Sequence, residues 1–214
     1  MQQLKTLTIR DLSKLIRNRK ISPVDLIKEL LPWSDELDPT LNIWASMDPD
    51  KVISQAEHYE SEIASGFYRG FMHGIPVGIK DIYHVQGMIT GCGSPIYSDF
   101  LPNYDSRVTE LLRSAGAIIM GKTITTQFAC GDPPLTKNPW DHCRTPGGSS
   151  SGSAVGVATN VFPAALGSQT AGSVLRPAAY NGIIGFKPTY GIVSRQGLFP
   201  VAPSLDTVGW FCRS

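Results

Sequence analysis

The sequence has 214 residues, of which 42% are hydrophobic, so a folded domain with a sizeable core is expected and extended disorder is excluded. The formal net charge is +1 with no block of one sign, which argues against direct binding of nucleic acid or of an anionic membrane surface. The chain has no apolar run of membrane-spanning length, no apolar signal segment and no CxxC pair among its four cysteines. We therefore expect a cytoplasmic protein with free thiols rather than disulfides or a zinc site.

Three helices are predicted in the first third of the chain from apolar residues that recur at helical spacing. They cover residues 8–18, 23–31 and 52–64, and a capping residue or proline opens the first two. Pro32 is expected to end or kink the second helix. Residues 1–70 are thus predicted to form a helical N-terminal region that lies over a sheet.

From residue 71 onward, short apolar runs bounded by glycine replace the helical pattern. Four such runs predict buried strands, at residues 75–79, 117–120, 164–167 and 182–186. Amphipathic stretches between them predict helices, at residues 107–115, 153–159 and 172–179. The order of elements predicts an α/β fold, with a central mixed β-sheet covered by α-helices, and residues 71–214 supply the sheet.

Two turns rich in glycine and serine lie between Pro146 and Pro177, and each ends where a helix is predicted. A glycine-rich turn that enters a helix aims several backbone N–H groups at one point, which suits a developing oxyanion. Ser173 lies in the second turn; the pattern alone favours a helix N-cap at this serine over a nucleophile. The first turn, GGSSSGS, has the composition of a flexible linker, but the apolar helix that follows it argues for a buried segment.

A serine nucleophile needs a base, and the four histidines stand in no recognisable triad motif. A base other than histidine is needed, and the sequence pattern alone does not identify one; Lys80 ends the apolar run at residues 75–79. Lysines are almost always at the surface, but desolvation at the end of a buried strand lowers the pKa of an ammonium group. Burial of Lys80 would therefore leave a neutral amine, the form that a base needs.

Three ordered segments of the chain resemble those of the amidase signature family, the serine hydrolases that act on amides with a Ser-Ser-Lys triad. They are residues 146–177, residues 73–81 and residues 116–123, and the likeness extends over nearly the whole chain. The resemblance implies hydrolysis of a carboxylic amide to an acid plus ammonia or an amine through an acyl-enzyme, without cofactor or metal. Because family members are longer, we expect the N-terminal part of a single amidase domain over residues 1–214, truncated at the C-terminus.

The resemblance also implies a role for each site residue. Ser173 is the nucleophile, Ser149 is the serine that follows a cis peptide bond 24 positions earlier, and Lys80 is the base. Ser149 would accept the proton of Ser173 while giving its own to Lys80. The oxyanion hole and substrate-binding turn are assigned to Thr170, Ala171, Gly172 and Ser173.

Several alternatives remain open at this point. The expected partner is a small-molecule amide, and the chain acts alone, as a homodimer, or as a glutaminase of the amidotransferase A type together with a partner subunit. Gln169 and Ala171 depart from the DTGGS that is typical of glutamyl-tRNA amidotransferase A subunits. A truncated, inactive amidase fragment is a further alternative. GAIIMGKT at residues 116–123 also matches the phosphate-loop pattern, but its middle residues have the pattern of a buried strand.

Overall fold

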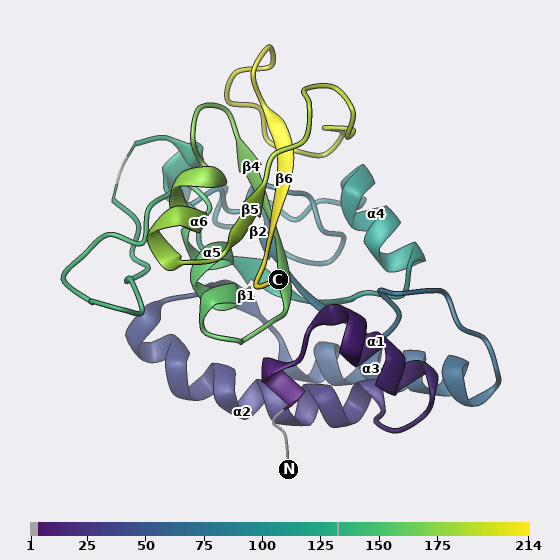
Figure 1. Ribbon diagram of the computed structural model, residues 1–214. Helices are drawn as coiled ribbons and strands as arrows, with labels where there is room; N and C mark the ends of the chain where they lie inside the picture. Colours follow the sequence, from purple (N-terminus) through teal and green to yellow (C-terminus); the bar gives the residue numbers. More distant parts are fainter. Residues whose placement is uncertain (1–3, 132) are drawn as a thin grey trace.

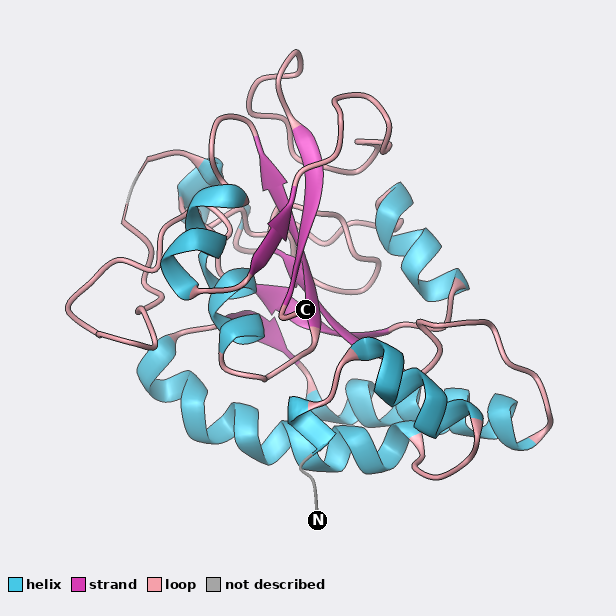
Figure 2. Cartoon of the chain, in the orientation of Figure 1, coloured by secondary structure: helices cyan, strands magenta, loops and turns pink. Residues whose placement is uncertain are grey.

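A six-stranded mixed sheet forms the centre of the computed structural model, which describes residues 4–131 and 133–214 (Figures 1 and 2). The strands are β1 Trp44–Met47, β2 Pro76–Lys80, β3 Ile118–Thr123, β4 Ala164–Gln169, β5 Ile184–Phe186 and β6 Thr207–Cys212. Their order across the sheet is β1-β3-β2-β4-β6-β5. β2 is parallel to both β3 and β4, whereas the outer pairs β1–β3, β4–β6 and β5–β6 are antiparallel.

Helices cover both faces of this sheet. They are α1 Ile9–Arg17, α2 Pro23–Leu41, α3 Pro49–Ala64, α4 Arg107–Ser114, α5 Ser151–Ala158 and α6 Leu175–Asn181. Figure 1 shows α1, α2 and α3 grouped together below the sheet. α5 and α6 lie side by side on one side of the sheet, and α4 lies on the other side. None of the described helices combines the length and apolar character needed to span a bilayer.

The alternation of side chains along the strands divides the core into two clusters. Ile118 and Met120 of β3 belong to the cluster that contains α1, α2, α3 and α5, whereas Ile119 belongs to the cluster packed against α4. In β2, Ile79 also lies in the cluster beside α4. Because successive residues of a strand point to opposite faces, Lys80 projects toward the face that α5 covers.

The mixed α/β fold and the predicted helices and strands are confirmed, with changes at their ends. Two strands were missed: β1, which lies inside the region predicted to be helical, and β6. The predicted helix at 172–179 begins only at Leu175, because residues 172–174 belong to the preceding turn. The prediction that the run at residues 182–186 is a buried strand is wrong in its burial. As an edge strand that pairs only with β6, β5 leaves Ile184 and Phe186 49% and 50% exposed.

Pro32 does not end the second helix, so of the expected end or kink only the kink remains a prediction. α2 continues through Pro32 and Pro39 to Leu41. A proline inside a helix costs about 3 kcal/mol, because it removes one backbone hydrogen bond. α2 buries Leu31 just before Pro32 and Leu41 at its end, and burial of one such side chain contributes about 1.5–3 kcal/mol. Packing on both sides of the proline therefore offsets its cost.

Residues 118–123 form a strand and not a phosphate-binding loop. All six residues of β3 are buried. Lys122 Nζ lies 2.7 Å from Asp81 Oδ1 and also donates to the backbone oxygen of Ile89 and to Thr90 Oγ1. The lysine of the phosphate-loop pattern is thus used inside the fold, as the buried strand pattern indicated.

Candidate active site

Two of the predicted site residues are in direct contact at the carboxyl end of β2. Lys80 is fully buried, and its Nζ donates to Ser149 Oγ at 2.6 Å and to Ser168 Oγ at 2.9 Å. Ser149 is 1% exposed and lies two residues before α5. The GGSSSGS segment is therefore a buried part of the fold, as its flanks indicated.

Burial lowers the pKa of Lys80 from 10.5 to about 7, while the Asp206 carboxylate and the Cys92 thiol act in the opposite direction. A pKa near 7 leaves a large share of neutral amine at neutral pH, as a base requires. Two neighbours of Lys80 add no charge in this range, because burial raises the pKa of Cys92 to about 12 and also raises the pKa of Tyr83. Both of these groups are neutral in the working range of a base with this pKa.

The turn that precedes α5 is shaped by a cis peptide bond between Gly148 and Ser149. Gly147 has φ +76°, and a Cβ there would lie 2.9 Å from the Cα of Pro177 in α6. Arg176 of α6 donates to the backbone oxygen of Gly148 from Nε at 3.1 Å and from Nη2 at 2.6 Å. Arg176 thus holds α6 against the first glycine-rich turn.

The second turn leaves β4 at Gln169 and carries Ser173, which is 9% exposed. The Gln169 side-chain oxygen accepts 2.9 Å hydrogen bonds from the backbone N–H groups of Val174 and Leu175. Among the described residues, none accepts a hydrogen bond from the N–H groups of residues 171–173. These free donors match what a site for a developing oxyanion needs.

The structure brings Lys80 and Ser149 together, whereas Ser173 forms no hydrogen bond with Ser149 or with any other residue that the structure describes. Sequence reasoning missed Ser168, the second hydroxyl on Lys80. The parallel pairing of β2 with β4, with Ile79 opposite Leu166, brings the end of β4 beside Lys80. Only the register between β2 and β4 identifies Ser168 as a partner of Lys80, and the sequence pattern does not reveal that register.

Asp206 is a further residue that sequence reasoning missed. It is 4% exposed, and its Oδ1 accepts a 2.5 Å hydrogen bond from Thr170 Oγ1 in the turn that carries Ser173. Its Oδ2 accepts from the backbone N–H groups of Val201 and Ala202 at 2.9 and 3.0 Å. Asp206 directly precedes β6, which was also missed, so its approach to the turn depends on the antiparallel pairing of β6 with β4.

The buried pair of Asp81 and Lys122 lies beside this site. Burial raises the pKa of Asp81 and lowers that of Lys122, and their 2.7 Å contact opposes both shifts. Asp81 also accepts the N–H of Gly91 at 3.1 Å. The ion pair therefore links the loop that follows β2 to strand β3. Its two charges are opposite and in contact, so together they add little net charge near Lys80.

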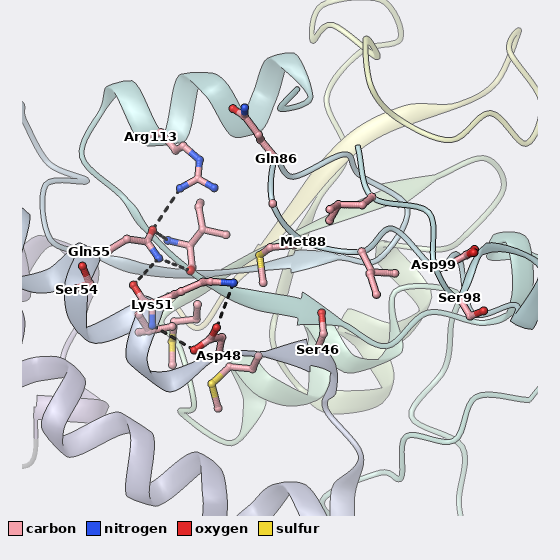
Figure 3. Close-up of a pocket in the computed structure, with 17 residues that line it drawn as sticks. Ser46, Asp48, Lys51, Ser54, Gln55, Gln86, Met88, Ser98, Asp99 and Arg113 are labelled. Carbon is pink, nitrogen blue, oxygen red and sulfur yellow. Dashed lines mark hydrogen bonds and ion pairs between the residues drawn. The ribbon is translucent and has the colours of Figure 1, made fainter. Parts of the chain in front are cut away.

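The cavity in Figure 3, of about 880 Å³, lies elsewhere, beside the N-terminal end of α3, and none of the site residues discussed above lines it. Its cationic groups already have partners, since Lys51 Nζ lies 3.2 Å from Asp48 and Arg113 Nη1 donates to Gln55 at 3.4 Å. Gln55 in turn bonds both the N–H and the C=O of Ile119 (Figure 3). In the described part of the chain, no three His, Cys, Asp or Glu side chains are grouped so as to hold a metal ion.

Comparison with known proteins places the chain in a family. The chain is 43% identical over 213 residues to the glutamyl-tRNA(Gln) amidotransferase A subunit of Gloeothece citriformis and 42% identical over 214 residues to that of Prochlorococcus marinus. Each alignment covers 97% of this chain and 44% of the relative, so the chain spans less than half the length of the curated relatives it matches.

Comparison with solved structures finds amidases and an amide hydrolase with the same fold. The native peptide amidase from Stenotrophomonas maltophilia superposes with a TM-score of 0.92 at 34% identity, over 98% of this chain and 45% of the other. A fatty acid amide hydrolase superposes with a TM-score of 0.90 at 27% identity, over 98% of this chain and 39% of the other. A family model described as Amidase matches residues 25–214, and the chain therefore belongs to the amidase family.

Proposed function

We propose that the chain is an amidase that hydrolyses a carboxylic amide to an acid plus ammonia or an amine, with Ser173, Ser149 and Lys80 as its triad. The observation that carries the proposal is the 2.6 Å contact between the fully buried Lys80 amine and Ser149 Oγ. A buried amine with a pKa near 7, in contact with a serine hydroxyl, is arranged to accept a proton rather than to hold one.

In the proposed reaction, Ser173 Oγ attacks the amide carbon while its proton passes to Ser149 Oγ and the Ser149 proton passes to Lys80 Nζ. A C–O bond forms, and the electron pair of the carbonyl π bond moves to its oxygen. Collapse of this intermediate breaks the C–N bond, and the proton returns from Lys80 through Ser149 to the departing nitrogen. Water then repeats the sequence on the acyl-enzyme and releases the acid.

The free N–H groups of residues 171–173 support an oxyanion hole in the same turn. Together with Thr170, they form the substrate-binding turn of the proposal. Loss of one such donor in other serine hydrolases costs about 3 kcal/mol of transition-state stabilisation. Ala171 in place of glycine leaves its N–H available, so the departure from DTGGS is compatible with this role.

A second candidate is a glutaminase of the amidotransferase A type that works together with a partner protein. The relatives named as A subunits of glutamyl-tRNA(Gln) amidotransferases, at 41–43% identity, favour it. Gln169 and Ala171 favour the general amidase, because they stand in the turn where those subunits typically read DTGGS. Ammonia release from glutamine, measured with the chain alone and with candidate partner proteins, distinguishes the two.

The first experiment is intact-mass analysis after exposure to a fluorophosphonate probe, which reacts with activated serines. The wild-type chain and a Ser98→Ala control, which removes an exposed serine, are expected to gain one adduct. Ser173→Ala is expected to gain none. Ser149→Ala and Lys80→Met are expected to slow labelling by roughly 10²- to 10⁴-fold, the usual contribution of a proton-transfer group.

The outcomes separate the alternatives. One adduct that persists in Ser173→Ala contradicts the assigned nucleophile. A folded wild-type chain with no adduct favours the inactive-fragment alternative. An adduct on Ser173 followed by ammonia release from a panel of aliphatic, aromatic and peptide amides would identify the substrate class.

A further inference from the structure

Asp206 contacts the turn of the proposed site that carries Ser173. One carboxylate oxygen accepts the Thr170 hydroxyl at 2.5 Å, which fixes the start of the turn that carries Ser173. The other is held by two backbone N–H groups, from Val201 and Ala202. With three donors on its oxygens and 4% exposure, the side chain has one orientation and little freedom to turn away.

Asp206 forms no ion pair with any residue in the described ranges 4–131 and 133–214, so its negative charge is not neutralised by contact. The negative charge of Asp206 raises the pKa of Lys80, against the effect of burial, and it also raises the pKa of Tyr83. The other groups around Lys80 contribute little net charge. Cys92 holds its proton because burial raises its pKa to about 12, and Asp81 and Lys122 lie 2.7 Å apart with opposite charges.

We propose that Asp206 is a positioning residue for the amidase reaction, which fixes the turn of Ser173 through Thr170 and stabilises, by its charge, the ammonium that Lys80 becomes when it accepts the proton. The inference rests on the proposed function. The charge that develops on Lys80 during attack is created in a buried site, where a fixed opposite charge acts strongly. Asp206 neither touches the substrate nor exchanges a proton, and it acts through Lys80 and Thr170.

The charge and the hydrogen bond can be separated by two variants. Asp206→Asn removes the negative charge but keeps the size of the side chain. Its amide oxygen can still accept from the N–H groups of Val201 and Ala202, and the Thr170 hydroxyl can turn to accept from its NH₂ group. Thr170→Val keeps the charge and removes the hydroxyl. Asp99→Asn, at an exposed carboxylate, is the matched control.

The first readout does not require activity. For each background, the stability of the chain with Lys80 is compared with that of the same chain carrying Lys80→Met, from pH 5 to 10. The pH at which this difference begins to rise reports the protonation of Lys80 in the folded chain, and we name it the Lys80 transition. Removing a nearby opposite charge disfavours the ammonium, so Asp206→Asn is expected to move the Lys80 transition to lower pH by about one unit.

Thr170→Val and Asp99→Asn are expected to leave the Lys80 transition in place. An unchanged transition in Asp206→Asn overturns the proposal, and so does an equal shift in Thr170→Val. Asp206→Glu retains the charge and keeps the test decisive if the Asn variant does not fold. Its transition is expected to stay near the wild-type value, and a fall of one unit in Asp206→Glu would count against a role for the charge.

The second readout is the pH dependence of probe labelling at Ser173. Its acid limb is expected to move to lower pH in Asp206→Asn, with a maximal rate that falls about tenfold or more, whereas a merely structural role lowers the rate without moving the limb. The proposal is overturned if the acid limb of the labelling profile lies at the same pH in the wild-type chain and in Asp206→Asn. A wild-type chain that is never labelled removes the proposed function instead, and the Lys80 transition still decides whether Asp206 acts on Lys80.

Discussion

Replacement of Lys80 by methionine is expected to remove a pH-dependent part of the stability of the fold. The pKa of Lys80 is lowered by burial from 10.5 to about 7. Below pH 7 the folded chain holds a buried ammonium at a cost, and between pH 7 and 10.5 the unfolded chain binds one proton more than the folded chain. Wild-type stability should therefore rise with pH across this window, relative to Lys80→Met, and level off above it.

The magnitude follows from the difference of about 3.5 pH units between the two states, at about 1.36 kcal/mol per unit. The full rise is about 5 kcal/mol, and about 3 kcal/mol of it falls between pH 7 and 9.5, a range in which unfolding can be followed by urea titration. The lost hydrogen bonds to Ser149 and Ser168 add a nearly constant offset, so only the slope carries the argument.

The matched control is Lys28→Met, which removes an exposed lysine of α2 and is expected to give a curve parallel to that of the wild type. Parallel curves for wild type and Lys80→Met from pH 6 to 10 would refute the reasoning, because they would mean that Lys80 keeps its ordinary protonation in the folded chain. A difference that falls with pH would refute it as well, since that sign belongs to a lysine stabilised as an ammonium.

Three further outcomes are expected. Arg176→Ala removes both hydrogen bonds to the Gly148 oxygen. It should lower the free energy of unfolding, measured by urea titration, by about 1–3 kcal/mol, and it should slow probe labelling, measured by labelling kinetics. Lys122→Met leaves the Asp81 carboxylate buried without its cation and should cost about 3–5 kcal/mol, whereas adding Asp81→Asn should recover much of that loss in a double-mutant cycle. Gln169→Ala removes the acceptor of two backbone N–H groups and should slow labelling, whereas Gln169→Glu, which keeps the acceptor, should retain it.

The sequence predicted those parts of the fold that depend on local pattern. The glycine-bounded apolar runs identified β2 and β4, because fully buried strands have no polar face to interrupt them. The position of Lys80 at the end of such a run was enough to predict its burial and the direction of its pKa. The sequence could not decide whether α2 ends or continues at Pro32, because continuation depends on side chains that pack from other parts of the chain.

The parts of the site that the sequence did not reveal depend on register between distant segments. Asp206 lies 36 positions after Thr170, and the two meet because β6 runs antiparallel to β4 with Thr207 opposite Gln169. Ser168 bonds Lys80 although 88 positions separate them. No local pattern marks such partners, and the family resemblance drew attention to the Ser-rich turns instead.

The contrast between two buried lysines shows why placement, and not residue type, defines the candidate base. Lys80 is the last residue of β2 and Lys122 the last but one of the neighbouring parallel strand β3, with Ile79 opposite Lys122 in the register. Lys122 has a carboxylate at 2.7 Å, which favours its charged form and makes it a structural cation. The hydrogen-bond acceptors of Lys80 are two serine hydroxyls, which stabilise an ammonium less and can themselves exchange a proton with the amine. Loss of the proton from Lys122 would break an ion pair, whereas loss of the proton from Lys80 relieves a desolvated charge that has no carboxylate of the described residues in contact, and this difference makes Lys80 the candidate base.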